Sequence, residues 1–197
     1  MKRLLFAVVF SAAAVAGPSQ GPPGPPVVVI LETEKGVIEI AVDVAKAPVT
    51  AANFLRYVDE GLYDGERFHR SVRPDTETRT DHPIQVIQAS RARGRRGHPP
   101  IPLERTRDTG LRHVDGAVSM ARVAGRPDSA ASDFFICIGD QPSLDFGGER
   151  NADGQGFAVF GRVVRGMDVV RAIQRAPVRP GSQTLMPPIG IVKAHRK

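Results

Sequence analysis

Short apolar runs of strand character, separated by Gly, Asp and Pro, limit most strongly what this chain can fold into. The first two runs, 27–31 and 37–42, are rich in Val and Ile, and the segment 33–36 (TEKG) between them has turn chemistry, so we expect a hairpin. Further runs of the same kind lie at 83–89, 116–120, 133–138, 157–164 and 189–192. This spacing is typical of an all-β barrel or sandwich, and it leaves the choice between the two open.

Two stretches depart from the strand pattern and predict short helices. The first, 50–60, follows Pro48, places its apolar residues on one stripe and stops at Gly61. The second, 166–174, carries three apolar residues at helical spacing. The sequence therefore predicts a mainly β domain with two α-helices.

The first 26 residues differ in composition from the rest of the chain. Lys2 and Arg3 precede an apolar run at 4–10 and a small-residue stretch ending in Ala14-Val15-Ala16, so 1–16 is predicted to be a cleaved signal peptide. Residues 17–26 (GPSQGPPGPP) are predicted to be a Pro/Gly-rich linker, and 27–197 a single domain. We expect an exported protein, periplasmic or extracellular, without stable membrane insertion after cleavage, because the apolar run is too short to span a bilayer.

Charge gives a weak indication of partners. The chain has 27 Lys+Arg and 21 Asp+Glu, a net charge of +6, and removal of Lys2 and Arg3 with the signal would leave 25 basic residues and +4. The arginines at 91, 93, 95 and 96 have no interleaved aromatic residues, which favours a solvated loop over an RNA-binding surface. No nucleic acid is expected as a partner, and a basic RNA-binding module stays as an alternative.

Most catalytic chemistries find no support in the residues present. The five histidines lack the spacing of metal ligands, so no metal is expected. Cys137 lies inside an apolar run, which favours a buried, unreactive thiol. Gly154 and Gly156 precede a strand and not a helix, so they indicate a turn and not a dinucleotide site, and no cofactor is expected.

Several longer blocks of sequence occur in a fixed order along the chain. They are Ala47-Pro48-Val49-Thr50, Asn53-Phe54, Gly61-x-Tyr63, Phe68-His69-Arg70, Val118-Ser119-Met120-Ala121, Phe134-Phe135-Ile136-Cys137, Leu144-Asp145, Val159-Phe160-Gly161-x-Val163 and Gly166-Met167. The series, which extends over about 28–192, closely resembles the cyclophilin-type peptidyl-prolyl cis-trans isomerases. The resemblance implies a closed eight-stranded antiparallel β-barrel capped by two α-helices. It also implies an enzyme that accelerates rotation about X-Pro bonds in unfolded or extended client segments and so assists folding.

The implied site combines a fixed cation with an apolar pocket. Rotation about an amide C–N bond has a barrier of about 18 to 20 kcal/mol, and at the twisted transition state the proline nitrogen becomes a hydrogen-bond acceptor. A guanidinium can donate to it, so Arg70 is the candidate catalytic donor, with Gln88 binding the peptide backbone. The resemblance places the proline ring among apolar residues and implies further substrate contacts. These substrate-binding residues are Val86, Phe135, Leu144, Phe157, Ala121 at the rim, His69, Arg122 and Asp133.

One region departs from the family pattern. The link 71–87 between Arg70 and Gln88 is longer than the usual one, and Gln85 stands where a pocket aromatic is expected, so the pocket wall is predicted to be altered. The alternative function is therefore a weakly active or inactive proline-peptide binder or chaperone on the same barrel. In either case the expected partners are proline-containing segments of client proteins, and the expected state is a monomer.

Overall fold

The computed structural model describes residues 27–90 and 97–197. The predicted signal peptide (1–16), the predicted linker (17–26) and the arginine cluster at 91–96 lie outside the described residues. Among the residues that are described, no helix has the length and apolar character needed to cross a membrane.

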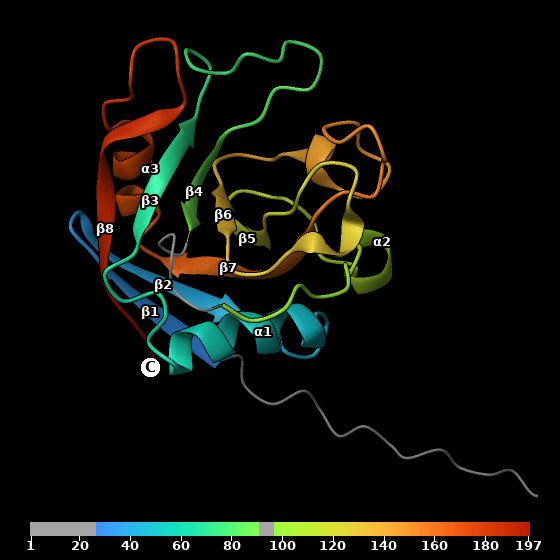
Figure 1. Cartoon of the computed structure of the whole chain (residues 1–197), viewed down its shortest axis with the longest axis horizontal. Coiled ribbons are helices and arrows are strands. Elements are labelled where there is room, and N and C mark those ends of the chain that lie inside the picture. The colour runs from blue at the N-terminus through green and yellow to red at the C-terminus, as the bar shows by residue number, and fades with distance from the viewer. Residues whose placement is uncertain (1–26, 91–96) are drawn as a thin grey trace, which may run out of the picture.

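The described chain forms a closed antiparallel barrel (Figure 1), with the strand order β1-β2-β7-β5-β6-β4-β3-β8. The strands are β1 (Val27–Thr33), β2 (Gly36–Val42), β3 (Arg67–Val72), β4 (Val86–Ser90), β5 (Ala117–Met120), β6 (Phe134–Cys137), β7 (Ala158–Arg165) and β8 (Thr184–Arg196). The fold implied by the family resemblance is therefore confirmed, and the sandwich is excluded because β1 and β8 pair and close the sheet.

The predicted hairpin and both predicted helices are present. In the turn between β1 and β2 the Thr33 hydroxyl donates to the Gly36 carbonyl at 2.7 Å, and Gly36 has a positive φ of 128°. Helix α1 (Pro48–Asp59) packs against β7 and β8, and α3 (Met167–Gln174) packs against β2, β3 and β4. The structure adds a one-turn helix, α2 (Thr106–Thr109), and two 3-10 turns, η1 (Pro127–Ser129) and η2 (Pro142–Leu144).

The last strand differs most from its predicted bounds. It was expected at 189–192, but β8 runs from Thr184 to Arg196. Two prolines, Pro187 and Pro188, interrupt the apolar pattern, and proline normally argues against a central strand. In the structure they fall between the paired residues Thr184 and Ile189, at a shift of the register with β3, so they cost the ladder few hydrogen bonds.

The interior divides into two groups of buried side chains on opposite faces of the sheet. The larger contains an aromatic cluster in which the Phe134 ring lies 5.5 Å from Phe54 and 5.4 Å from Tyr63. The smaller group contains Phe135, the next residue along β6, together with the fully buried Cys137. Because side chains alternate along a strand, Phe134 fills the core and Phe135 faces the second group, where the candidate site lies.

Candidate active site

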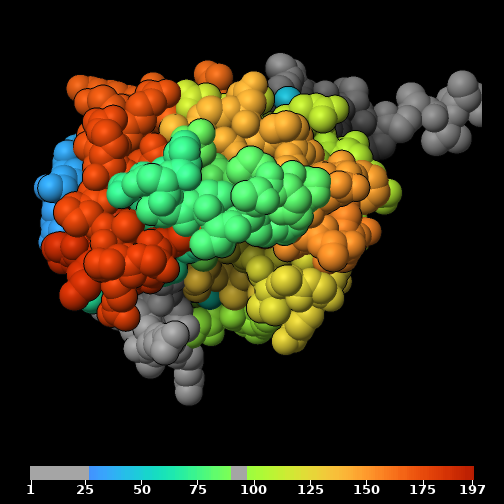
Figure 2. Space-filling model, turned by 90° about the horizontal axis from the view of Figure 1, so that it is seen from above, coloured from blue at the N-terminus to red at the C-terminus, as the bar shows by residue number. Residues whose placement is uncertain are grey.

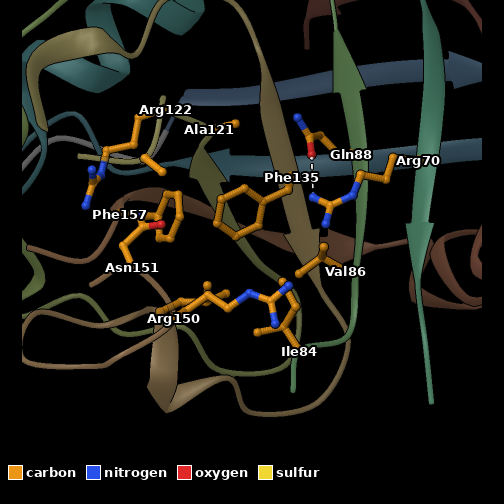
Figure 3. Close-up of a pocket in the computed structure, with 12 residues that line it drawn as sticks. Arg70, Ile84, Val86, Gln88, Ala121, Arg122, Phe135, Arg150, Asn151 and Phe157 are labelled. Atoms are coloured by element: carbon orange, nitrogen blue, oxygen red, sulfur yellow. Dashed lines mark hydrogen bonds between the residues drawn. The ribbon is translucent and has the colours of Figure 1, made fainter. Parts of the chain in front are cut away.

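A pocket of about 290 Å³ opens on the smaller apolar group (Figure 3). Eight of the residues singled out in the sequence line it: Arg70, Val86, Gln88, Ala121, Arg122, Phe135, Leu144 and Phe157. Four that sequence reasoning missed also line it: Ile84, Ala124, Arg150 and Asn151. The pocket thus brings together an apolar floor and three arginines.

Arg70 reaches the pocket from β3 and is fixed by two carboxamides. Strand pairing places it opposite Gln88 of β4, and its Nη1 donates to Gln88 Oε1 at 3.0 Å (Figure 3). Its Nε and Nη2 both donate to Gln183 Oε1, at 2.9 and 2.7 Å. A guanidinium has five N–H groups, so two, one on each terminal nitrogen, are left for a ligand.

The charge of Arg70 is partly desolvated. Burial lowers the pKa of Arg70 from its usual value, nearby Arg150 lowers it further, and Glu77 opposes both effects. Arginine nevertheless stays protonated, because its ordinary pKa lies far above neutral pH. None of the ion pairs among the described residues includes Arg70, so its charge has no direct carboxylate partner there.

The floor of the pocket is built from aromatic and aliphatic side chains. The Phe135 and Phe157 rings meet edge to face, with centroids 5.5 Å apart. Leu144 and Val86 are each 2% exposed and complete the floor. Such a floor favours an apolar ring of about the size of proline and lowers the dielectric around the neighbouring cation.

The turn before Phe157 confirms the expectation for its glycines. Gly154 and Gly156 have positive φ values of 61° and 67°, and they lead into β7 and not into a helix. A Cβ on Gly156 would lie 2.6 Å from the carbonyl carbon of Asp145. The backbone at 156 therefore approaches that of Asp145 so closely that only glycine fits there. This close approach sets Phe157 beside Leu144.

A buried polar chain that sequence reasoning missed supports Phe135 from behind. His113 Nδ1 lies 2.8 Å from Asp145 Oδ1, and its Nε2 lies 3.0 Å from Ser119 Oγ. The His113 ring stacks on Phe135 at 5.9 Å, with an interplanar angle of 11°. The order of contacts is that of a serine hydrolase triad, but Ser119 is fully buried and no substrate reaches it. The hydrogen-bonded series Asp145–His113–Ser119 therefore orients Phe135 and is not a second catalytic centre.

Acidification is expected to weaken the fold through His113. Burial lowers the pKa of His113 from its usual 6.5, and the hydrogen bond with Asp145 opposes that shift. Below about pH 6.5 the histidine side chain binds a proton in the unfolded chain but stays neutral in the folded one. The free energy of unfolding therefore decreases as the pH decreases, by at most about 1.4 kcal/mol per pH unit for each such group. Burial lowers the pKa of His69 as well, so it contributes in the same window.

Urea unfolding between about pH 7.5 and 5.5 measures this effect. His113→Asn should be less stable at the upper pH and should lose less stability than the wild type on acidification. A variant slope equal to that of the wild type would show that His113 does not cause the pH dependence.

Three of the implied substrate-binding residues have other surroundings than expected. His69 and Asp133 are not among the residues that line the pocket, and the Asp133 charge acts on His69, where it opposes the lowering of the pKa by burial. Arg122 lines the pocket, but its guanidinium makes a double contact with Asp153, at 2.7 and 2.8 Å, and donates to the Gly156 carbonyl. Arg122 therefore fixes the 153–156 turn, and its Cζ lies 5.2 Å from the centroid of the Phe157 ring.

The lengthened link borders the pocket without filling it. Figure 2 shows the segment around 73–84, in light green, between the C-terminal region in red and the region around 147–156 in orange. Its buried Glu77 forms an ion pair of 2.8 Å with Arg150. Ile84 lines the pocket, whereas Gln85, the expected position of the pocket aromatic, does not. In this part of the pocket wall, Ile84 supplies an apolar contact.

Within 27–90 and 97–197, no group of three or more His, Cys, Asp and Glu side chains is placed to hold a metal ion. The pocket itself presents fixed donors beside an apolar floor. Such a site can stabilise a polar or twisted amide, and it offers no exposed nucleophile among the residues that line it.

Comparisons with known proteins agree with this geometry. The family model described as cyclophilin type peptidyl-prolyl cis-trans isomerase/CLD matches residues 28–196. Peptidyl-prolyl cis-trans isomerase A of Dickeya dadantii is 38% identical over 173 residues, which cover 84% of this chain and 82% of that protein. Peptidyl-prolyl cis-trans isomerase B of Escherichia coli is 35% identical over 153 residues, 74% of this chain and 83% of that protein.

A solved structure shares the fold. The cyclophilin-type isomerase of Cryptosporidium parvum, determined in the presence of the dipeptide Ala-Pro, superposes with a TM-score of 0.69 at 20% identity and covers 86% of this chain and 98% of its own. The non-catalytic alternative is not favoured, because the bacterial relatives that match most of this chain are named as isomerases. From its barrel, its pocket and these relatives, the chain is a member of the cyclophilin-type peptidyl-prolyl cis-trans isomerase family.

Proposed function

We propose that the pocket around Arg70 binds proline-containing segments of client proteins and is where their X-Pro bonds are isomerised. The observation that carries this proposal is the Arg70 guanidinium, which has two N–H groups without a partner among the described residues, beside the apolar floor of Phe135 and Phe157. A relative that shares the fold was determined with Ala-Pro present, which supports a proline peptide as the ligand.

The proposed mechanism needs only binding and hydrogen bonding. The proline ring packs on the floor, and the free Nε2 of Gln88, whose Oε1 is engaged by Arg70, donates to a peptide carbonyl. As the C–N bond twists, amide resonance is lost and electron density returns to the proline nitrogen. The free N–H groups of Arg70 then bond more strongly to the twisted amide than to the planar one, and this difference lowers the barrier.

An isomerisation assay tests the activity directly. Residues 17–197 should accelerate cis-trans exchange of the tetrapeptide Ala-Ala-Pro-Phe well above the uncatalysed rate, which corresponds to tens to hundreds of seconds. Binding of the peptide without any acceleration would favour the chaperone alternative. Since a single chain supplies all residues of the pocket, we propose that the monomer is the active unit.

We also propose that the protein is exported and acts outside the cytoplasm, in a periplasmic or extracellular space. The support is the order of Lys2 and Arg3, the apolar run 4–10 and Ala14-Val15-Ala16. The full chain, expressed in a bacterial host, should be recovered from the periplasm or medium with Gly17 as its first residue, as measured by intact mass. A cytoplasmic product that retains residues 1–16 would contradict export.

A further inference from the structure

Gln183 contacts the proposed catalytic cation more extensively than any other described side chain. Its Oε1 accepts from both Nε and Nη2 of Arg70, whereas Gln88 accepts from Nη1 alone. Gln183 lies 113 residues away in sequence, directly before β8, and does not line the pocket. Because Gln183 contacts Nε and Nη2 of Arg70 and is not among the residues that line the pocket, it can act on a ligand there only through Arg70.

The orientation of the Gln183 amide is itself fixed. Its Nε2 donates to the Thr76 carbonyl at 3.1 Å, and its backbone carbonyl accepts from Ser71 N–H at 2.8 Å. A flipped amide would set its NH2 against the donors of Arg70 and its oxygen against the Thr76 carbonyl, so only one orientation satisfies both neighbours. The acceptor is therefore always directed at Arg70.

The Thr76 carbonyl belongs to the first turn of the lengthened link. Arg73 and Thr76 close this turn, with Arg73 N–H donating to Thr76 Oγ1 at 3.1 Å and Thr76 N–H donating to the Arg73 carbonyl at 2.9 Å. Arg73 Nη1 in turn donates to the carbonyls of Gln174 and Ala176 at the end of α3, at 2.7 and 3.0 Å. The added segment thus connects α3 to Gln183, and through it to Arg70.

The neutrality of Gln183 matters as much as its position. A carboxylate there would also accept two hydrogen bonds, but it would form an ion pair with Arg70 and compensate the charge. A carboxamide fixes the same Nε and Nη2 groups of Arg70 but carries no charge, so the positive charge of Arg70 is not compensated by its partner. This distinction concerns transition-state stabilisation, because both side chains would offer an acceptor to the guanidinium, although a carboxylate would lose the hydrogen bond to the Thr76 carbonyl.

We propose that Gln183 is a positioning residue of the isomerase, which uses a neutral acceptor braced by the Thr76 turn to fix Arg70 without compensating its charge. The inference rests on the proposed function of Arg70. It gives the lengthened link a role in catalysis, because the first turn of that link anchors the residue that orients the donor.

Two substitutions separate position from charge. Gln183→Met keeps the side-chain size and removes the acceptor. Gln183→Glu keeps an acceptor, adds a charge and loses the donor to the Thr76 carbonyl, so the protection of the Arg70 Nε–H is needed to show whether the guanidinium stays in place. Ser182→Ala is the matched control, since Ser182 bonds to Thr184 and not to Arg70. For each variant, NMR gives the exchange rate of bound Ala-Ala-Pro-Phe, the Kd of the peptide, and the shift and solvent exchange of the Arg70 Nε–H.

In Gln183→Met we expect the on-enzyme exchange rate to fall about tenfold, because both hydrogen bonds that orient Nε and Nη2 of Arg70 are lost, while the Kd changes less than about twofold. The Arg70 Nε–H should shift and exchange faster with solvent. In Gln183→Glu the Nε–H should stay protected while the rate still falls, and Ser182→Ala should match the wild type.

Each other outcome identifies what is wrong. If Arg70→Ala is inactive but Gln183→Met keeps the wild-type rate and Nε–H signal, Gln183 does not position Arg70. If Gln183→Glu keeps the full rate, the neutrality of the acceptor has no role and the proposal fails in that part. If Arg70→Ala itself keeps the wild-type rate, the proposed function of Arg70 fails. Should Gln183→Met not fold, Gln183→Leu, which also lacks an acceptor, takes its place.

Discussion

Arg70→Ala is expected to lower kcat/KM for proline-peptide isomerisation by about 10² to 10³, the usual effect of removing one fixed donor aimed at a transition state. The wild-type guanidinium is partly desolvated and fixed on three of its five N–H groups, so it needs little reorganisation when the amide twists. Alanine removes that donor and leaves the apolar floor in place. Peptide affinity should therefore fall much less than the rate.

Arg70→Lys is the informative companion variant. Lysine keeps the positive charge but cannot make the forked contacts to Gln88 and Gln183, so we expect a rate between those of the wild type and the alanine variant. Line-shape analysis of a proline peptide by NMR gives rate and affinity in one experiment. Equal rates for the wild type and Arg70→Ala, with both proteins folded by circular dichroism, would remove Arg70 from the mechanism.

Phe134→Ala is expected to lower the free energy of unfolding by about 3 to 5 kcal/mol, the range for deleting a buried phenylalanine. The Phe134 ring is fully buried and meets Phe54, Tyr63 and Phe68 edge to face, with centroids 5.4 to 6.0 Å apart. Its loss would leave a cavity whose walls belong to α1, to the turn that follows it and to β3. These elements cannot all move inward to fill the cavity, so most of the cavity remains and the loss of stability is large.

Phe157→Ala provides the comparison, because it removes the same side chain from a half-buried position in the pocket. It should destabilise less than Phe134→Ala while reducing peptide affinity more. Urea unfolding measures the first difference and a peptide titration the second. Equal loss of stability in the two variants would mean that the Phe134 cluster is not the main anchor of the barrel.

The barrel and the centre of the pocket could be predicted because their signals are local. Strand period and turn residues located the hairpin and most strands, and the order of the sequence blocks distinguished a barrel from a sandwich. The pairing of Arg70 with Gln88 follows from two adjacent strands joined by one link. Such features depend on residues that are close in sequence or on a familiar series of motifs.

The support around the pocket could not be predicted, because it comes from distant irregular segments. Gln183 precedes a strand whose start is obscured by two prolines, and Arg150 lies in a loop that reaches the pocket through an ion pair with Glu77. His113 gave no motif signal, since its partners Ser119 and Asp145 belong to separate blocks. His69 was singled out as part of the Phe68-His69-Arg70 block and Asp133 for its place before Phe134, and their side chains do not line the pocket.

The closed sheet has a consequence for a protein that meets unfolded chains. Extended segments carry unpaired backbone donors and acceptors and add readily to any exposed strand. In the described barrel each strand has a bonded neighbour on both sides, so a client segment finds no edge at which to extend the sheet. We therefore expect extended peptides to bind at the surface of this barrel and not to join its sheet as an additional strand.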